Sequence, residues 1–237
     1  MRMLEFGGVQ KSSLVDYPGK IVMTLFLPGC NFRCGFCHNK DLVLNPERLD
    51  VINEDEVLSL LEKRRELIDG ICITGGEPLF SDIGSLKLFI EKVKSIHRSD
   101  GEFVVKLDTN GSYPDRLSKL MPLVDFVAMD IKTSSEKYLD CVKSGYKEEH
   151  IMRSIDLIKN SGKDYEFRTT LVPGVVGLSD FESIAKMISG ADRMILQKFI
   201  PDNTLDETFS EVNAYPDEVF HEARNILQDS VKEVIIR

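Results

Sequence analysis

The sequence predicts an α/β fold in which strands and helices alternate along the chain. Short runs with β-propensity are separated by segments with helical spacing, an order typical of a parallel sheet with right-handed crossovers. A doubly wound open sheet or a barrel would both satisfy that order. Polar or reactive side chains stand at the ends of six successive strands, which favours a barrel or part of one. We therefore expect a partial parallel (β/α)6 barrel with a short N-terminal extension.

The expected elements follow from local composition and periodicity. Seven short runs predict strands: 21–27, 70–74, 103–108, 125–130, 165–171, 193–199 and 231–236. Apolar residues three and four positions apart predict five helices: 53–67, 82–97, 148–160, 179–189 and 216–228. The first of these helices opens on Asn53 with Glu56 three positions later, which is the pattern of a capping box.

No repeat, low-complexity tract or flexible linker divides the 237 residues. We expect one domain over residues 1–237. In it, residues 1–20 form the N-terminal extension, residues 21–200 form the partial barrel core, and residues 201–237 form a C-terminal loop, helix and strand.

Charge and composition exclude several classes of protein. The chain has 39 acidic and 30 basic residues, a net charge of −9, and 42% hydrophobic residues. Binders of nucleic acids and of anionic membranes need a basic face, so we expect neither partner. The apolar run 21–27 is too short to span a bilayer, and the first residues lack the apolar stretch of a signal peptide. We expect a cytoplasmic protein.

The strongest chemical signal is a group of three cysteines within eight positions, Cys30, Cys34 and Cys37. In a reducing compartment such a group indicates metal ligation or redox chemistry rather than structural disulfides. Structural zinc prefers four protein ligands, and His38 is poorly placed to share one ion with the adjacent Cys37. Three thiolates on a [4Fe–4S] cluster would instead leave one iron open to an external ligand.

The Cys-x3-Cys-x2-Cys pattern, with Phe36 before its last cysteine, resembles the signature of the radical S-adenosylmethionine (SAM) superfamily. The resemblance extends over most of the chain and implies that the partial barrel is of the radical SAM type. It implies a [4Fe–4S] cluster on Cys30, Cys34 and Cys37, with SAM on the open iron. The implied reaction is reductive cleavage of SAM to methionine and a 5′-deoxyadenosyl radical.

Two later motifs add to this resemblance. Gly75-Gly76-Glu77-Pro78 alone would indicate a strand-to-helix turn, but in this order it resembles the superfamily motif that binds the SAM amino group. Glycines there let backbone carbonyls approach a ligand closely. Asp108-Thr109-Asn110-Gly111 and Asp130-Ile131-Lys132 alone indicate a turn and a charge pair, but together resemble motifs of glycyl-radical-enzyme activases.

The resemblance implies a set of SAM-binding residues. These are Phe36, Cys37, His38, Gly75, Gly76, Glu77, Asp108, Thr109, Asn110, Asp130, Lys132 and Arg168. Arg168 could equally form a structural ion pair. A monovalent cation near Asp108, Thr109 and Asp130 is also implied. The pyruvate formate-lyase type has a histidine at the end of strand six, whereas residues 196–199 here contain none, so that contact is left open.

The N-terminal segment resembles one particular group among the glycyl-radical-enzyme activases. Residues 8–20, continuing into residues 27–30, closely resemble the activating proteins of anaerobic ribonucleoside-triphosphate reductase. The implied function is to generate a glycyl radical on that partner enzyme. An anaerobic setting and a flavodoxin or ferredoxin-like electron donor are implied with it.

Other interpretations stay open from the sequence. A radical SAM enzyme acting on a small molecule, such as a carboxydeazaguanine synthase, would share the cluster and the SAM site. So would an activase of another glycyl-radical enzyme, such as pyruvate formate-lyase, or a peptide- or tRNA-modifying member. A zinc-binding module is the non-enzymatic alternative. Cys72 and Cys141 lack ligand spacing and are expected to be structural thiols, and residues 202–211 are expected to form a rim loop.

Overall fold

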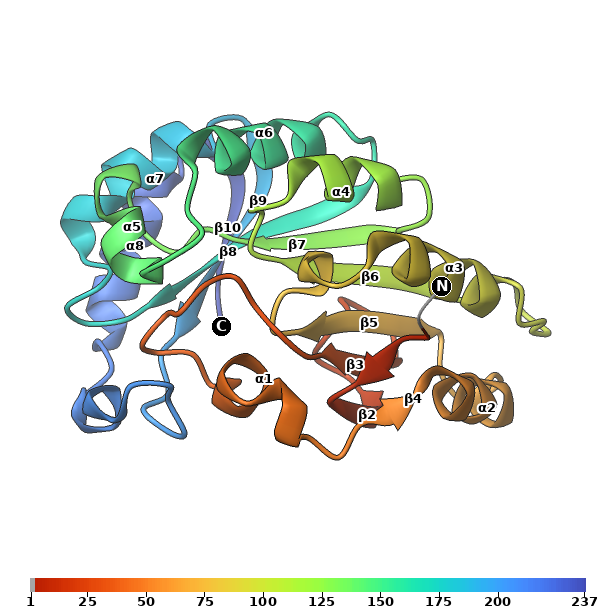
Figure 1. The fold of residues 1–237 in the computed structure, drawn as a ribbon. Helices are drawn as coiled ribbons and strands as arrows, with labels where there is room; N and C mark the ends of the chain where they lie inside the picture. Colours follow the sequence, from red (N-terminus) through yellow and green to blue (C-terminus); the bar gives the residue numbers. More distant parts are fainter. Residues whose placement is uncertain (1–2) are drawn as a thin grey trace. The chain divides into compact units, whose positions relative to one another are not determined.

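A computed structural model describes residues 3–237, whose helices and strands are drawn in Figure 1. These residues fold into two compact units. The first unit comprises the chain up to Cys30 together with residues 41–109 and 115–127. The second comprises residues 31–40, 110–114 and 128–237. The expectation of a single domain stays a prediction, and the first two residues of the expected N-terminal extension lie outside the described residues.

The first unit is built on four neighbouring strands, β2 (Gly8–Ser13), β3 (Val22–Leu27), β5 (Gly70–Gly75) and β6 (Val104–Thr109). The pairs β3–β5 and β5–β6 are parallel, as the sequence predicts. β2 pairs antiparallel with β3, so the N-terminal extension forms an added edge strand in this unit. A separate antiparallel pair joins β1 (Glu5–Phe6) to β4 (Ile52–Asn53).

Helices of the first unit begin where the sequence provides caps. α2 (Glu54–Arg64) starts with the expected capping box, in which the Asn53 side chain accepts the Glu56 N–H at 2.9 Å. α3 (Ile83–Lys94) is capped by Asp82 and buries the predicted apolar face. Both helices end about one turn before the predicted limits. The sequence did not indicate the short α1 (Lys40–Leu44) and α4 (Pro114–Leu120).

The chain passes into the second unit along β7 (Phe126–Asp130). Three parallel strands follow in the order of the sequence: β8 (Asp164–Leu171), β9 (Ala191–Lys198) and β10 (Val231–Ile236). The helices are α5 (Tyr138–Val142), α6 (Glu148–Lys159), α7 (Phe181–Met187) and α8 (Asp217–Leu227). α7 packs against α8, and α8 packs against β10. The short α5 is a further helix that the sequence did not indicate.

The architecture confirms the predicted α/β class with a mostly parallel sheet. β2 in the first unit and β10 in the second each have one neighbour, so the sheet is open in both units, as a partial barrel requires. Strands such as β3 and β5 are nearly continuous apolar runs, because parallel strands are buried on both faces.

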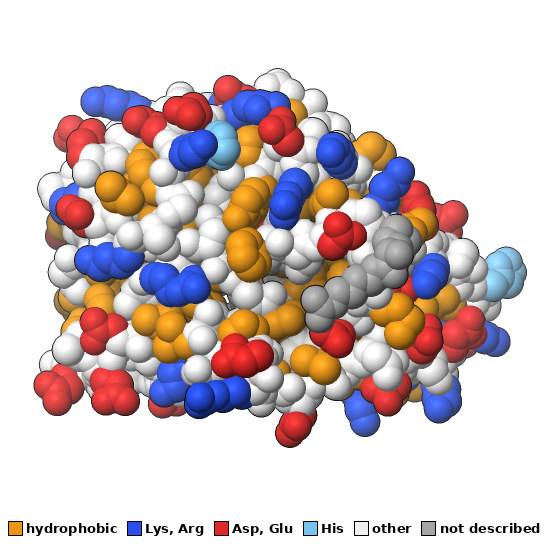
Figure 2. Space-filling model, viewed as in Figure 1, with side chains coloured by type: hydrophobic (Ala, Val, Ile, Leu, Met, Phe, Trp, Pro, Cys, Tyr) orange, Lys and Arg blue, Asp and Glu red, His pale blue; other side chains and the backbone are white. Residues whose placement is uncertain are grey.

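The surface carries charges of both signs. Figure 2 shows lysine and arginine side chains interspersed with aspartate and glutamate on the face it presents. None of the helices within residues 3–237 combines the length and apolar character that crossing a bilayer requires.

Candidate active site

The loop after β3 carries the three cysteines of the motif. Cys30 is the last residue of the first unit before the chain enters the second, to which Cys34 and Cys37 belong. The Cys37 N–H donates to the Cys34 carbonyl at 3.1 Å, so these two cysteines lie on one tight turn, as their spacing predicts. None of the cysteines in the described chain forms a disulfide.

One other segment of the second unit holds this turn by its backbone. The Leu205 N–H donates to the Cys37 carbonyl at 2.9 Å, and the Asp206 N–H donates to the Gly35 carbonyl at 2.8 Å. A Cβ at Gly35 would lie 2.5 Å from the Phe209 ring, so this close approach requires glycine. The segment that the sequence suggested as a rim loop therefore supports the cysteine turn.

The thiols of the turn lie in a mostly buried setting beside a cation. Cys34 donates a hydrogen bond to Cys141, which together with burial raises the pKa of Cys34 well above its ordinary value. The same hydrogen bond lowers the pKa of Cys141. Burial raises the pKa of Cys37, and the charge of Lys132 acts in the opposite direction on both turn cysteines. Lys132 therefore favours the thiolate forms, which are the forms that bind metal.

A carboxylate held between two cations lies at the end of β7. Asp130 accepts from Lys132 Nζ at 2.8 Å and from Arg168 Nε at 2.8 Å. Burial raises the pKa of Asp130, but Arg168 and Lys132 lower it more, so it lies well below its usual value. Burial lowers the pKa of Lys132, but Asp130 raises it more, to above its usual value. The group therefore carries one net positive charge, and Arg168 is in an ion pair.

The first unit contains a second buried ion pair, on β6. Lys106 is 2% exposed, and its ammonium group pairs with Asp108 and lies 3.9 Å from the Cys72 sulfur. Sequence reasoning missed Lys106, although residues two apart on a strand share a face and a lysine beside Asp108 was visible in the sequence. Lys106 neutralises and orients the Asp108 carboxylate.

We expect the Lys106→Met variant to lose about 1–3 kcal/mol of unfolding free energy, because the Asp108 carboxylate would lose its buried cation. Guanidinium denaturation would measure the loss. The matched control is Lys87→Met, whose exposed ammonium lies 3.6 Å from Glu91, and we expect it to stay within about 0.5 kcal/mol of the wild type. Equal stability of the two variants would contradict the assigned role of Lys106.

The Gly75-Gly76-Glu77 turn at the end of β5 depends on its glycines. Gly75 has φ +119°, and a Cβ there would lie 2.4 Å from the backbone of Leu27. A Cβ at Gly76 would lie 2.0 Å from the Gly29 carbonyl oxygen and 3.3 Å from the Cys30 Cβ. The turn therefore packs directly against the backbone that leads to Cys30.

The buried Glu77 side chain has a structural task in the first unit. One carboxylate oxygen accepts the Leu79 N–H at 3.0 Å and the Thr109 hydroxyl at 2.8 Å. This carboxylate thus caps the 3₁₀ turn Pro78–Phe80 and links the end of β5 to the end of β6.

We expect Gly76→Ala to destabilise the protein by about 1–3 kcal/mol, since the added methyl group would overlap the Gly29 carbonyl. A fall in the thermal midpoint would report it. Gly8→Ala is the control, because its Cβ would make ordinary contacts of 3.6–3.9 Å with Phe26. A Gly76→Ala protein as stable as Gly8→Ala would show that the two segments are not tightly packed.

The remaining predicted residues of the second unit are held by hydrogen bonds and ring contacts. Asn110 donates to the Asn31 side chain at 3.1 Å and accepts the Ser112 N–H at 2.9 Å. The His38 ring lies 2.8 Å from the Ile200 carbonyl, stacks on Phe199, and is therefore tied to the chain after β9. The Phe36 ring meets the Phe209 ring edge-on, with centroids 6.2 Å apart.

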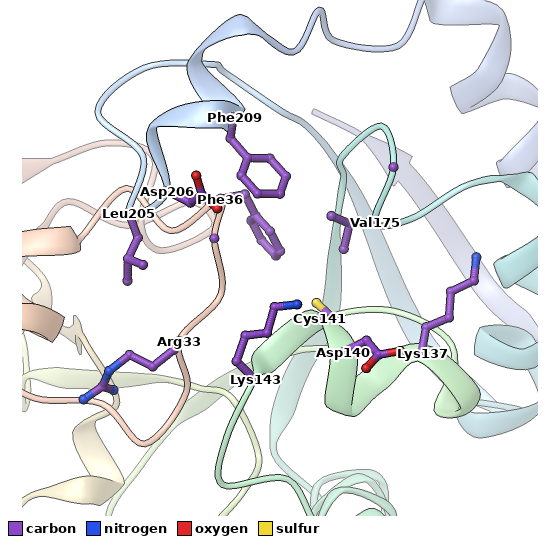
Figure 3. Close-up of a pocket in the computed structure, with 12 residues that line it drawn as sticks. Arg33, Phe36, Lys137, Asp140, Cys141, Lys143, Val175, Leu205, Asp206 and Phe209 are labelled. Atoms are coloured by element: carbon purple, nitrogen blue, oxygen red, sulfur yellow. The ribbon is translucent and has the colours of Figure 1, made fainter.

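A cavity of about 620 Å³ lies beside the cysteine turn in the second unit. Figure 3 shows Phe36, Phe209 and Val175 directed toward it, with the Lys143 ammonium and the Cys141 sulfur on the opposite wall. The cavity lining thus combines aromatic rings, three basic residues, two aspartates and one thiol. Sequence spacing did not single out Cys141 or Lys143.

The cysteine donors of the motif fit an iron–sulfur cluster. Within residues 3–237, no three His, Cys, Asp or Glu side chains converge on one point as the ligands of one ion would. In a [4Fe–4S] cluster each thiolate binds a different iron, so its ligands surround one cube rather than one ion. In the second unit, Cys34 and Cys37 offer two such thiols on one turn beside the Lys132 cation.

Comparison with known proteins identifies the class. The Radical SAM superfamily matches residues 24–188. A Methanocaldococcus jannaschii protein assigned as a glycyl-radical enzyme activating enzyme is 31% identical over 97% of this chain and 94% of its own. The pyruvate formate-lyase-activating enzyme of Streptococcus mutans is 28% identical over 68% of this chain and 62% of its own.

Solved structures agree on the fold. A domain of the pyruvate-formate lyase-activating enzyme from Bacteroides vulgatus superposes with a TM-score of 0.54 at 17% identity. The match covers 71% of this chain and 98% of that domain. The chain therefore belongs to the radical SAM superfamily, and within it to the glycyl-radical-enzyme activating type. It is an enzyme of a family whose members use a [4Fe–4S] cluster and SAM.

Proposed function

We propose that this enzyme cleaves SAM reductively and generates a glycyl radical on anaerobic ribonucleoside-triphosphate reductase. The Cys34–Cys37 turn beside Lys132 carries the cluster part of the proposal. The choice of partner is supported by the N-terminal segment, whose residues 8–20 resemble the activating proteins of that reductase. The relatives named for activating glycyl-radical enzymes support a partner of that class.

Cys30, Cys34 and Cys37 would hold the cluster through their thiolates and leave one iron for the SAM amino and carboxylate groups. When bound, the cluster supplies the electron that splits SAM into methionine and a 5′-deoxyadenosyl radical, which takes a hydrogen atom from the partner's glycine. A flavodoxin or ferredoxin-like protein would deliver that electron. The pKa of both turn thiols is raised, and the charge of Lys132 opposes that rise, which assists their ligation.

The remaining residues would bind and orient SAM. The net positive charge on the Asp130, Lys132 and Arg168 group suits an anionic carboxylate. Backbone carbonyls at Gly75 and Gly76 would accept the SAM amino group, as the resemblance of this motif implies. Asp108 and Asp130 would accept hydrogen bonds from the ribose hydroxyls. Six further residues would line the SAM site or support the residues that line it. These are Glu77, Thr109, Asn110, Phe36, Cys37 and His38.

The monovalent cation near Asp108, Thr109 and Asp130 stays a prediction. Lys106 pairs with Asp108, and Lys132 and Arg168 pair with Asp130, so protein cations already neutralise both carboxylates. Potassium dependence of SAM binding in an otherwise potassium-free buffer would support the cation. SAM affinity that is identical with and without potassium would count against it.

Anaerobic reconstitution with iron and sulfide, followed by reduction in the presence of SAM, tests the chemistry. We expect visible absorbance from the cluster and release of 5′-deoxyadenosine. Purified candidate partners are then added, and electron paramagnetic resonance detects a glycyl radical on the one that is activated. A radical on pyruvate formate-lyase and none on the reductase would replace the proposed partner, since relatives of that type are similar across most of this chain.

Turnover stimulated by a small molecule and by no protein would overturn the activase proposal while leaving SAM cleavage intact. Zinc in oxygen-protected protein, without SAM turnover, would overturn both. The open sheet favours a protein substrate, because a loop of another protein needs lateral access that a closed barrel lacks.

A further inference from the structure

Cys141, which the proposed function leaves unused, lies against a cysteine of the turn. The Arg33 N–H donates to the Val142 carbonyl at 2.8 Å, and the neighbouring residues on the two segments are Cys34 and Cys141. The two thiols are hydrogen-bonded to each other. The Cys141 sulfur also lies 3.9 Å from the Lys132 carbonyl oxygen, which fixes its position on α5. This arrangement brings two reduced sulfurs from distant parts of the sequence into contact.

The pair is shielded by protein on most sides, and its Cys141 thiol is reachable through the cavity. Cys34 is 6% exposed and Cys141 is 8% exposed. Figure 3 shows the Cys141 sulfur directed into the cavity, across from Phe36. Because the cavity holds about 620 Å³, small molecules such as hydrogen peroxide or dithiothreitol can enter it.

We propose that Cys34 and Cys141 form a reversible disulfide in the enzyme without its cluster, a redox modification site that withholds one cluster ligand. Hydrogen peroxide as oxidant takes one proton and one electron from each thiol. One S–S bond forms, the O–O bond breaks, and two water molecules leave. A dithiol reductant reverses the step and becomes a disulfide itself. The consequence for the cluster rests on the proposed function, whereas the disulfide itself does not.

The competing product is a bond within the Cys34-Gly35-Phe36-Cys37 turn, since Cys-x-x-Cys sequences readily form disulfides. The structure favours Cys141 because Cys34 already contacts that thiol through a hydrogen bond. Cys37 instead accepts a hydrogen bond from the Asn39 backbone, and Cys34 acts on it only through charge. The partner of Cys34 is therefore the decisive observation.

Peptide mapping of the full chain tests the inference. The protein is isolated without iron, treated with hydrogen peroxide, alkylated, and digested with trypsin. Cleavage after lysine and arginine places Cys34 and Cys37 in peptide 34–40, Cys141 in peptide 138–143, and Cys30 in peptide 21–33. We expect peptides 34–40 and 138–143 to be joined by a disulfide and to separate after dithiothreitol treatment. Fragmentation of the joined peptides in the mass spectrometer should assign the bond to Cys34.

Variants identify the participants. Cys141→Ser should abolish the linked pair, while Cys37→Ser and Cys72→Ser should retain it. A bond inside peptide 34–40, a bond from Cys37 to Cys141, or five thiols that all stay reduced would each overturn the inference.

Iron uptake separates this inference from the proposed function. Reduced wild type and Cys141→Ser should both take up iron and sulfide, and oxidised wild type should bind about tenfold less iron until it is reduced. Oxidised Cys141→Ser should retain its iron uptake. If reduced wild type binds no iron, the proposed cluster fails whichever bond the map shows. If reduced wild type binds iron and the Cys34–Cys141 bond is absent, only the disulfide fails.

Discussion

The Cys34→Ala variant is expected to lose both the cluster absorbance and the release of 5′-deoxyadenosine. Cys34 lies on the turn closed by the Cys37 N–H, and removing its thiolate would leave one iron of the cluster without a protein ligand. Loss of an outer partner of a metal ligand already costs about 10–100-fold, so loss of the ligand should exceed about 100-fold. Anaerobic reconstitution with iron determination and chromatography of the products would measure both effects.

Cys72→Ala is the matched control for that experiment. Cys72 is fully buried in β5 and contacts Lys106 rather than the cysteine turn. We expect this variant to bind iron and to cleave SAM as the wild type does. Circular dichroism would establish that Cys34→Ala is folded. A folded Cys34→Ala protein with wild-type iron content and turnover would refute the assignment of Cys34 as a ligand.

The Asp130→Asn variant is expected to show the largest loss of stability. Asp130 neutralises both Lys132 and Arg168, and breaking a buried ion pair by removing one partner costs about 3–5 kcal/mol. The Asp130 side chain is 26% exposed, so we expect the lower end of that range. At about 2–4 °C per kcal/mol for a chain of this size, the thermal midpoint should fall by about 6–12 °C.

Asp217→Asn provides a comparison at an exposed ion pair. The Asp217 side chain is 79% exposed and lies 3.2 Å from Lys198. Surface pairs contribute about 0–1 kcal/mol, so the midpoint should hardly move. Similar midpoints for Asp130→Asn and Asp217→Asn would contradict the role assigned to the Asp130 group.

The difference in unfolding free energy between wild type and Asp130→Asn should become smaller in strong acid. The pKa of Asp130 is lowered in the folded protein, where Arg168 and Lys132 outweigh the effect of burial. A carboxyl group whose pKa is lowered by folding stabilises the folded state fully at pH values above its pKa in the unfolded chain, about 3.9. This stabilisation disappears as the pH falls through the pKa of the group in the folded protein. Denaturation at several pH values should give a constant difference from about pH 5 to 8 and a smaller one in strong acid. A difference that grows in acid would reverse the sign of this argument.

Local chemistry accounts for the parts of the fold that could be predicted. The capping box at Asn53 and Glu56 is a contact between near neighbours, and α2 begins where it indicates. The apolar runs that became β3 and β5 are short and bounded by turn residues, so their limits were predicted within about a residue. The short helices α1, α4 and α5 lack the length over which helical periodicity becomes visible, and they were missed.

The residues of the candidate site likewise include some that the sequence could predict and some that it could not. Cys30, Cys34 and Cys37 were recognisable because their spacing lies within one loop. Cys141 had no such signal, since it meets Cys34 only after α5 packs on that loop. Lys106 was adjacent to a predicted motif, but its importance depends on burial, which one strand read alone does not reveal.

The sequence by itself determined the parallel α/β class, the thiol-rich loop and the order of the motifs along the strands, because each depends on residues a few positions apart. Tertiary packing decided which charge each carboxylate faces: Asp108 meets Lys106 on one strand, while Asp130 is shared by Lys132 and Arg168 from different strands and loops. It also decided that Cys141 lies beside Cys34. Electrostatic and sulfur–sulfur contacts act over a few ångströms in space, and separation along the chain does not reveal that distance.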